Sequence, residues 1–140
     1  MSAEAARQVT TIFGFDFGER RIGVAVGQTI TRSATPLGII GVRDGQPDWA
    51  VLTQMVRDYE PQLLVVGMPT HESGNPHALA ARVERFCQQL HERYRLPVEI
   101  IDEYLSSVEA ERRADAIAGQ VDALAAQVIL ETWLNENRGA

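Results

Sequence analysis

The chain has 140 residues, 45% of them apolar and 23% charged, which is the balance expected for one globular domain. The formal net charge of −6 argues against a general nucleic-acid-binding protein, because such proteins normally carry a basic excess. No apolar run is long enough to span a membrane, and the first residues lack the layout of a signal peptide. The single cysteine, Cys87, excludes an internal disulfide, so we expect a cytoplasmic protein with no membrane partner.

Arginine supplies all 13 positive charges, and the chain contains no lysine. The P-loop pattern GxxxxGK[ST] needs a lysine, so a Walker-type nucleotide site is excluded. Arginine forms planar, two-pronged contacts with phosphate, and a few well-placed arginines can therefore bind a nucleic-acid backbone despite the acidic total. Compositional bias is the alternative explanation for the missing lysine.

The first half of the chain predicts three strands and a helix. Residues 9–17 are rich in β-branched and aromatic side chains, and a turn leads from them to two further apolar segments, 22–28 and 33–40. These segments predict an antiparallel three-stranded meander. Apolar residues recur at helical spacing between 47 and 59, and Pro61 ends this predicted helix.

The second half alternates strands and helices. Residues 62–69 form a continuously apolar run typical of a central strand, and 98–103 predict another buried strand. Between them we expect an amphipathic helix at about 78–94. A capping box, S-x-x-E, begins a further helix at residue 106, and the last helix is expected at about 121–135. This order indicates one α/β domain, with an antiparallel edge to its sheet and helices on both faces.

Asp16 is the first acid that the predicted sheet does not explain. Strand alternation puts it on the face of Gly14, with Phe15 and Phe17 on the other face. A carboxylate inside a sheet is costly unless it is paired, hydrogen-bonded or bound to a cation. The alternative is a strand-end residue that caps the turn at Gly18.

Asp122 raises the same question on the last predicted helix. At about 100° per residue, a polar stripe lies on the opposite side of this helix. The stripe consists of Gln120, Gln127, Glu131 and Asn135. If it faces water, Asp122 points toward the core together with Ala126, Ile129 and Trp133. The alternative is an acid near a helix N-terminus, where the helix dipole stabilises it by about 0.3–1 kcal/mol.

Asp102 and Glu103 lie where the strand at 98–103 leaves the sheet, and ligands of open α/β sheets gather at such strand ends. Alternation sends the two side chains to opposite faces, so only one can join Asp16. Several carboxylates at one edge would repel one another unless a divalent cation neutralised them. Carboxylate oxygens suit Mg²⁺ or Mn²⁺, and phosphoryl transfer is the chemistry that two such ions perform. We therefore hypothesise a metal-dependent phosphodiesterase.

Four segments, taken together, resemble the YqgF family of RNase H-like proteins: FDFGERRIGVAVG, VVGMP with a downstream Gly74, DEYLSSVEA and VDALAAQVILETWL. The likeness extends from about residue 12 to residue 134. Members are described as pre-16S rRNA nucleases and as candidate Holliday junction resolvases. The resemblance implies an RNase H-like mixed five-stranded sheet, three antiparallel strands then two parallel ones, with helices on both faces. It implies one domain over 1–140, with flexible tails at about 1–8 and 136–140.

The resemblance also assigns the site. Asp16, Glu103 and Asp122 match the family's acids and would be the catalytic ligands of Mg²⁺ or Mn²⁺, with Glu103 preferred to Asp102. Arg20 and Arg21, on the hairpin beside Asp16, would contact phosphate, and a solvated turn is the alternative.

Basic residues near this site are fewer than the family commonly has. Tyr104 stands in place of an arginine, and Gln120 and Val121 stand where a lysine often precedes the final aspartate. Four arginines lie in and just after the helix expected at about 78–94 and could form a nucleic-acid track: Arg82, Arg85, Arg93 and Arg95. The interspersed Glu84 and Glu92 favour an ordinary salt-bridged surface instead.

The implied function is a divalent-metal-dependent nuclease acting on structured RNA, with precursor 16S ribosomal RNA as the expected substrate and the ribosome as a candidate partner. One alternative is a Holliday junction resolvase acting on branched DNA. Resolving a four-way junction symmetrically needs two active sites, so this alternative requires a stable dimer, whereas we expect a monomer or a weak homodimer. A third hypothesis is a weakly catalytic nucleic-acid- or ribosome-binding module, and the missing basic residues support it.

Overall fold

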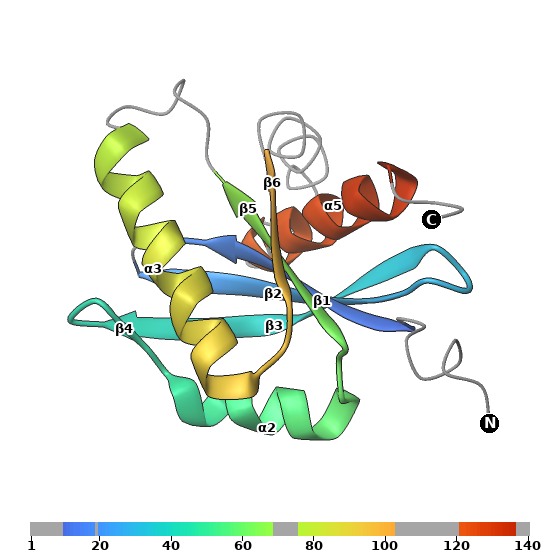
Figure 1. The fold of residues 1–140 in the computed structure, drawn as a ribbon, viewed down its shortest axis with the longest axis horizontal. Helices are drawn as coiled ribbons and strands as arrows, with labels where there is room; N and C mark the ends of the chain where they lie inside the picture. Colours follow the sequence, from blue (N-terminus) through green and yellow to red (C-terminus); the bar gives the residue numbers. More distant parts are fainter. Residues whose placement is uncertain (1–9, 19, 69–75, 103–120, 137–140) are drawn as a thin grey trace.

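Figure 1 shows the computed structural model, which describes residues 10–18, 20–68, 76–102 and 121–136. The side chains of 76–79, 102, 121 and 122 are not part of that description. Tails were predicted at about 1–8 and 136–140; residue 136 is instead the last residue of the final helix, and the rest of both tails lies outside the described residues. The helix predicted to begin at residue 106 also lies outside them.

One mixed sheet joins all the described strands, in the order β4-β3-β2-β1-β5-β6. The strands are β1 (Thr11–Phe17), β2 (Arg21–Gln28), β3 (Ser33–Arg43), β4 (Gln46–Pro47), β5 (Leu63–Met68) and β6 (Val98–Asp102). The first three form an antiparallel meander, and β5 and β6 run parallel to β1. This confirms the predicted mixed sheet with its antiparallel part followed by two parallel strands.

The strand count is six, and the prediction of five was wrong because it missed β4. Strand β3 continues to Arg43, which pairs with Gln46 across a two-residue turn. Both turn residues have positive φ, 53° at Asp44 and 77° at Gly45. Asp-Gly is a preferred sequence for such a tight hairpin turn, so the signal was present in the sequence.

Three helices are described: α2 (Trp49–Tyr59), α3 (Pro76–Tyr94) and α5 (Val121–Glu136). The Asp48 carboxylate caps the start of α2 by accepting a hydrogen bond from the Val51 amide at 3.4 Å. At its other end Glu60 adopts a left-handed conformation and donates its amide to the Val56 carbonyl at 2.8 Å, directly before Pro61. Among these described helices, none is long and apolar enough to cross a membrane.

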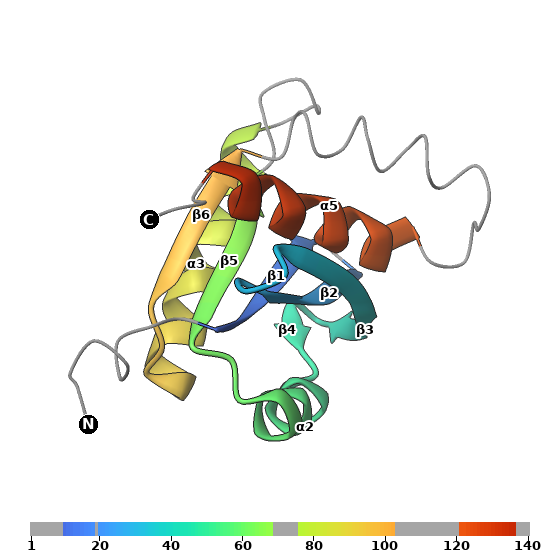
Figure 2. The same cartoon turned by 90° about the vertical axis from the view of Figure 1, so that its right-hand side faces the viewer.

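The helices cover both faces of the sheet, as predicted (Figure 2). On one face, Phe13, Phe15 and Val66 pack in a core with Leu52 of α2 and Phe86 of α3. The opposite face packs against α5, and the core there is formed by Ile12, Ala25, Val65, Ile101, Ala126, Ile129 and Leu130. Asp16 follows Ile12 and Gly14 by strand alternation, so it lies on the α5 face.

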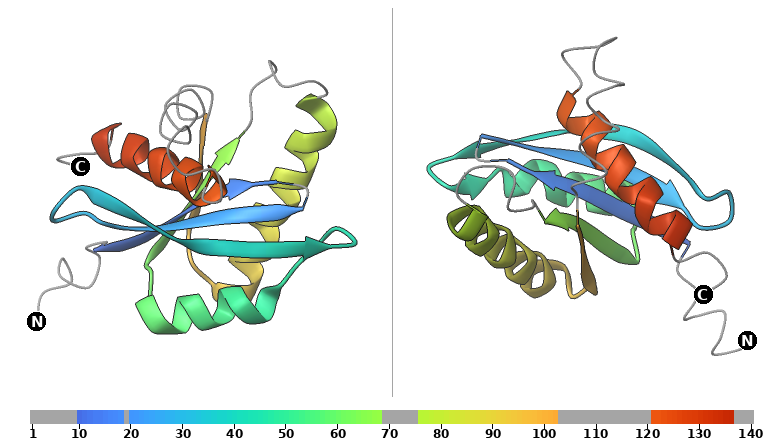
Figure 3. Two further views of the ribbon diagram at one scale, coloured as in Figure 1. Left: turned by 180° about the vertical axis from the view of Figure 1, so that it is seen from behind. Right: turned by 90° about the horizontal axis from the view of Figure 1, so that it is seen from above.

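Helix α5 lies across β1 and β2 at close range (Figure 3). A Cβ atom built on Gly14 would stand 2.8 Å from the Leu130 Cβ and 3.1 Å from the Ala126 carbonyl oxygen. On β2, a Cβ on Gly27 would stand 2.8 Å from the Leu130 Cδ2. These two glycines therefore let the helix backbone approach the strand that carries Asp16.

Candidate active site

The carboxyl ends of β1, β5 and β6 meet at one edge of the sheet. In the parallel register, Asp16 pairs with Gly67, and Gly67 pairs with Ile101. Met68 then pairs with Asp102, the last residue of β6. Ligands of open α/β sheets bind beyond the carboxyl ends of strands, so this edge is the expected position of a site.

Asp16 is half-buried on the α5 face, and glycines flank it on both neighbouring strands. Its partner on β2 is Gly23, and its partner on β5 is Gly67. Neighbouring strands lie about 4.8 Å apart, so any side chain at these two positions would stand directly beside the carboxylate. Because both positions are glycine, neither neighbouring strand places a side chain beside the carboxylate. Sequence reasoning missed both glycines, because only the strand register places them next to Asp16.

Asp122 is the second residue of α5, and its side chain is outside the description. Ala126 is one turn further along the helix and contacts the sheet at Gly14, two residues before Asp16 on the same face. The start of α5 therefore lies on the face that carries Asp16 (Figure 3). That Asp122 and Asp16 share a ligand stays a prediction.

The environment of α5 differs in part from the predicted one. Ala126 and Ile129 are buried and Trp133 is half-buried, as expected for the side that faces the sheet. The prediction that Gln127 faces water was wrong: this side chain is half-buried, and its Nε2 donates to the Ala34 carbonyl at 2.9 Å. The start of β3 thus reaches the polar side of the helix. Among the described side chains of the stripe predicted to face water, only Asn135 is exposed.

Glu103, the preferred second acid, lies outside the described residues, and Asp102 is described only as the backbone end of β6. Within the described part of the chain, no three His, Cys, Asp or Glu side chains come together as a metal cluster. Of the three proposed ligands, only the side chain of Asp16 belongs to that part. The metal site therefore stays a prediction.

Arg20 and Arg21 lie at the same edge, in the turn after β1 and at the first position of β2, and both are exposed. The Arg20 carbonyl accepts a hydrogen bond from the Val42 amide at 2.9 Å, which holds this turn against β3. Their exposure leaves the phosphate-binding prediction and the solvated-turn alternative open.

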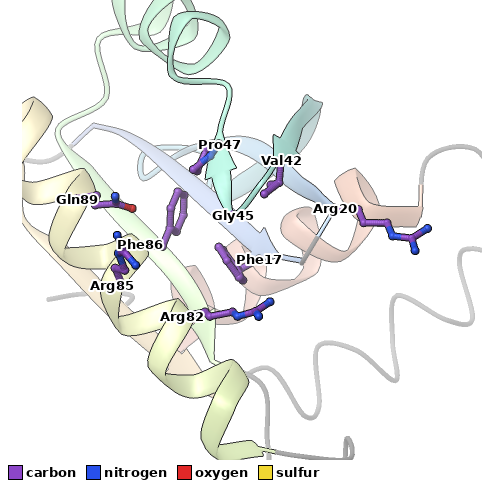
Figure 4. A pocket seen from close by; sticks show the side chains of 9 residues that line it. All are labelled: Phe17, Arg20, Val42, Gly45, Pro47, Arg82, Arg85, Phe86 and Gln89. Atoms are coloured by element: carbon purple, nitrogen blue, oxygen red, sulfur yellow. The ribbon is translucent and has the colours of Figure 1, made fainter.

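A cavity of about 350 Å³ opens beside this turn, on the face of the sheet opposite the Asp16 carboxylate (Figure 4). Its floor includes the rings of Phe17 and Phe86, and Arg20 of the turn and Arg82 and Arg85 of α3 contribute the positive charge. Sequence reasoning favoured an ordinary surface for Arg82 and Arg85 and missed this cavity. The cavity is formed by a turn and a helix that are far apart in the sequence, and only the tertiary fold brings them together.

A mixed sheet covered on both faces, with an aspartate at the carboxyl end of its first strand, is the arrangement of RNase H-like proteins. Comparison with known families gives the particular one: residues 10–136 match RuvX, described as Holliday junction resolvase. The chain belongs to this family, and the resemblance to the YqgF family is thereby confirmed.

Curated relatives agree with this assignment. A protein of Hydrogenovibrio crunogenus named putative pre-16S rRNA nuclease is 47% identical over 124 residues, which cover 89% of this chain and 92% of the relative. A protein of Nitrosococcus oceani with the same name is 42% identical over 144 aligned positions, which cover 99% of this chain and 95% of the relative.

Solved structures share the fold at low sequence identity. Thermus thermophilus RuvC in complex with a Holliday junction substrate matches with a TM-score of 0.58 at 14% identity, over 93% of this chain and 96% of that chain. A fowlpox virus resolvase in complex with Holliday junction DNA matches with a TM-score of 0.54 at 10% identity, over 91% of this chain and 98% of that chain. These likenesses confirm the RNase H-like architecture.

Proposed function

We propose that this chain is a divalent-metal-dependent nuclease that cleaves structured RNA, with precursor 16S ribosomal RNA as its substrate. The family and the relatives named as nucleases confirm the prediction of a hydrolase that acts on phosphodiester bonds. The observation that carries the proposal is the position of Asp16, at the carboxyl edge of the parallel strands between two glycines.

The donor set fits a hard divalent cation. Asp16 offers carboxylate oxygens between Gly23 and Gly67 of the neighbouring strands, and we assign Glu103 and Asp122 as the further ligands. All three are oxygen donors, which Mg²⁺ and Mn²⁺ prefer. When bound, a pair of such ions would activate water and stabilise the leaving oxygen of the phosphodiester.

The chain's own residues position the substrate. Strand β1 is paired on both sides, so the backbone of Asp16 is held in place and its side chain starts on the α5 face. Arg20 and Arg21 extend the same edge with two exposed cations, which we assign to non-bridging phosphate oxygens of the strand that is cut. The basic side chains hold the phosphodiester, and the acids act at the reacting phosphorus.

RNA is the favoured substrate because the relatives with 47% and 42% identity carry the pre-16S rRNA name. Branched DNA is the second candidate, favoured by the family description and by resolvases of the same fold. The two differ in assembly, since symmetric junction cleavage requires two sites and therefore a stable dimer. We propose a monomer or weak homodimer that works in the cytoplasm and meets its RNA with or near the ribosome.

Parallel cleavage assays test this function. Precursor 16S RNA and a four-way DNA junction are incubated with the protein in Mg²⁺, in Mn²⁺ and in a chelator. We expect metal-dependent cleavage of the RNA and no activity in the chelator. Asp16→Asn should lower the rate by about 100-fold or more, the scale for losing one group that stabilises transition-state charge. Its thermal melt should stay close to that of the wild type.

Asp58→Asn is the matched control, because Asp58 is an exposed acid on α2 whose carboxylate accepts a hydrogen bond from Gln54. It removes the same charge and should leave cleavage unchanged. Equal cleavage by the wild type and Asp16→Asn would refute the assigned site. Preferential cutting of the junction would replace the RNA assignment with the resolvase, and RNA binding without cleavage would favour the weakly catalytic module.

A further inference from the structure

Arg82 and Arg85 form a pair of like charges on α3. They are three residues apart, so they lie on one face of the helix, and such a pair costs a few tenths of a kcal/mol. No residue three or four positions from either arginine along the helix is acidic. Glu84 lies two residues from Arg82 and one from Arg85, where helical side chains do not face each other.

The face that carries this pair is turned toward the cavity at the end of β1. Arg82, Arg85, Phe86 and Gln89 all line it, and Arg20 of the β1–β2 turn lines it from across the sheet edge. Figure 4 shows Arg82 reaching from α3 toward Phe17, Arg85 one turn further on, and Arg20 on the far side with its guanidinium group directed outward. No acid is among the described residues that line this cavity.

The cavity combines this charge with a partly open aromatic surface. Phe86 is 1% exposed and belongs to the core, whereas Phe17 is half-buried. The centroids of the two rings are 5.3 Å apart. The three arginines are all exposed. A volume of about 350 Å³ is at the lower end of the range for ligand pockets and suits one nucleotide. Exposed aromatic rings beside arginines are the usual combination in grooves that bind single strands.

We propose that this cavity, at Phe17, Arg82 and Arg85, binds one backbone phosphate of the substrate RNA strand, with the attached nucleotide against the Phe17 ring. The inference rests on the proposed nucleic-acid substrate. Phe17 directly follows Asp16, and their Cα atoms are about 3.8 Å apart. Their side chains point to opposite faces of the sheet. The RNA strand would therefore cross the carboxyl edge of the sheet, with the cleaved phosphate on the Asp16 face and the bound phosphate on the Phe17 face.

A free nucleotide offers the same phosphate chemistry, so the experiment has an arm for each source. Binding of a short fluorescent single-stranded RNA is measured in a chelator, where cleavage cannot occur, over a series of salt concentrations. A second arm measures binding of a nucleoside monophosphate and of inorganic phosphate. The test variant is Arg82→Gln/Arg85→Gln. The control is Arg57→Gln/Arg95→Gln, which removes two exposed arginines that do not line the cavity.

We expect the test variant to bind RNA roughly tenfold more weakly at low salt. Its slope of log affinity against log salt should be shallower by about 0.7, the contribution of one lost phosphate contact on a single strand. The control pair should change the slope by much less, and Arg82→Lys/Arg85→Lys should restore most of it. Free nucleotides should bind weakly to all the proteins.

Three results would overturn the inference. Equal slope changes in test and control variants would show general electrostatic attraction. An unchanged slope in a folded test variant would show that the cavity does not meet the strand. Loss of mononucleotide binding with unchanged RNA binding would assign the cavity to free nucleotides. Because binding is measured without metal, a failure of cleavage would end the proposed nuclease function and leave this inference standing on its own data.

Discussion

The choice between Asp102 and Glu103 as the second acid depends on the face of the sheet that each side chain takes. Asp16, Gly67 and Ile101 form one row across the three parallel strands, and in-register residues of parallel strands share a face. Ile101 packs with the α5 core, the face of Asp16. By strand alternation we expect the side chain of Asp102 on the other face and that of Glu103, two positions after Ile101, on the face of Asp16.

We therefore predict that Glu103→Gln lowers metal-dependent RNA cleavage by about 100-fold or more, like Asp16→Asn. Asp102→Asn makes the same chemical change one residue away and should keep the rate within a few fold of the wild type. Initial rates at saturating Mn²⁺, with thermal melts to verify folding, provide the measurement. The reverse ranking would make Asp102 the second ligand.

A second residue-scale prediction concerns Cys87, which is half-buried beside the α3 core. Burial raises the pKa of its thiol from 9.0 to about 11. The thiolate fraction at neutral pH should thus be about 100-fold below that of an unperturbed thiol, and alkylation correspondingly slow. Because the folded pKa is raised, the neutral thiol favours the native state below pH 9.0, and this contribution is lost as the pH rises toward about 11.

The alkylation rate of Cys87 against pH provides the check, with the chain unfolded in guanidinium as its control. The native protein should titrate near the higher value and the unfolded chain near the ordinary one. Coincident titration curves would contradict the burial of this thiol.

The elements most visible in the sequence were those with a strong apolar pattern. The meander, the central strand, α2, α3 and α5 all appear close to their predicted positions, because alternation and helical spacing are local properties. The short β4 was missed, since two residues carry no periodicity and only the Asp-Gly turn announces them. The solvent exposure of Gln127 was also mispredicted, because the neighbouring β3 reaches it from outside the helix.

At the same scale, contact between α5 and β1 depends on Gly14. In Gly14→Ala the new Cβ would meet the Leu130 Cβ at 2.8 Å, so the helix must move away from the strand. We expect a loss of about 1–3 kcal/mol in the free energy of unfolding, the usual cost of overpacking. Cleavage should also fall at temperatures where the variant remains folded, because α5 carries Asp122.

Gly41→Ala is the matched control for this substitution, since a Cβ at that position of β3 meets nothing within 4 Å. Chemical denaturation of both variants measures the difference in stability. If Gly14→Ala were as stable and active as Gly41→Ala, close packing of α5 would not be what positions the acid.

For the molecule as a whole, the sequence was sufficient to predict the fold class and the family, whereas the site could be predicted only in part. Asp16 could be selected from its place in an apolar strand. The glycines beside Asp16 come from segments far apart in the sequence. The same is true of Arg20, Arg82 and Arg85, which line one cavity. Local patterns cannot encode such distant neighbours, and a net charge of −6 concealed a local concentration of positive charge.

The oligomeric state of the whole molecule distinguishes the two candidate substrates, structured RNA and branched DNA. We predict that sedimentation at micromolar concentrations shows a monomer or a weakly associating dimer. A stable dimer that persists on dilution would instead provide the two sites that junction resolution requires, and it would favour branched DNA.

The central claim is that Asp16, Glu103 and Asp122 hold one metal centre at the carboxyl edge of the sheet. A crystal structure determined with Mn²⁺ and its anomalous signal tests this most directly. We predict an ion about 2.0–2.3 Å from a carboxylate oxygen of Asp16, with Glu103 and Asp122 completing its protein ligands. Mn²⁺ bound elsewhere, with these three carboxylates directed to separate surfaces, would contradict the account.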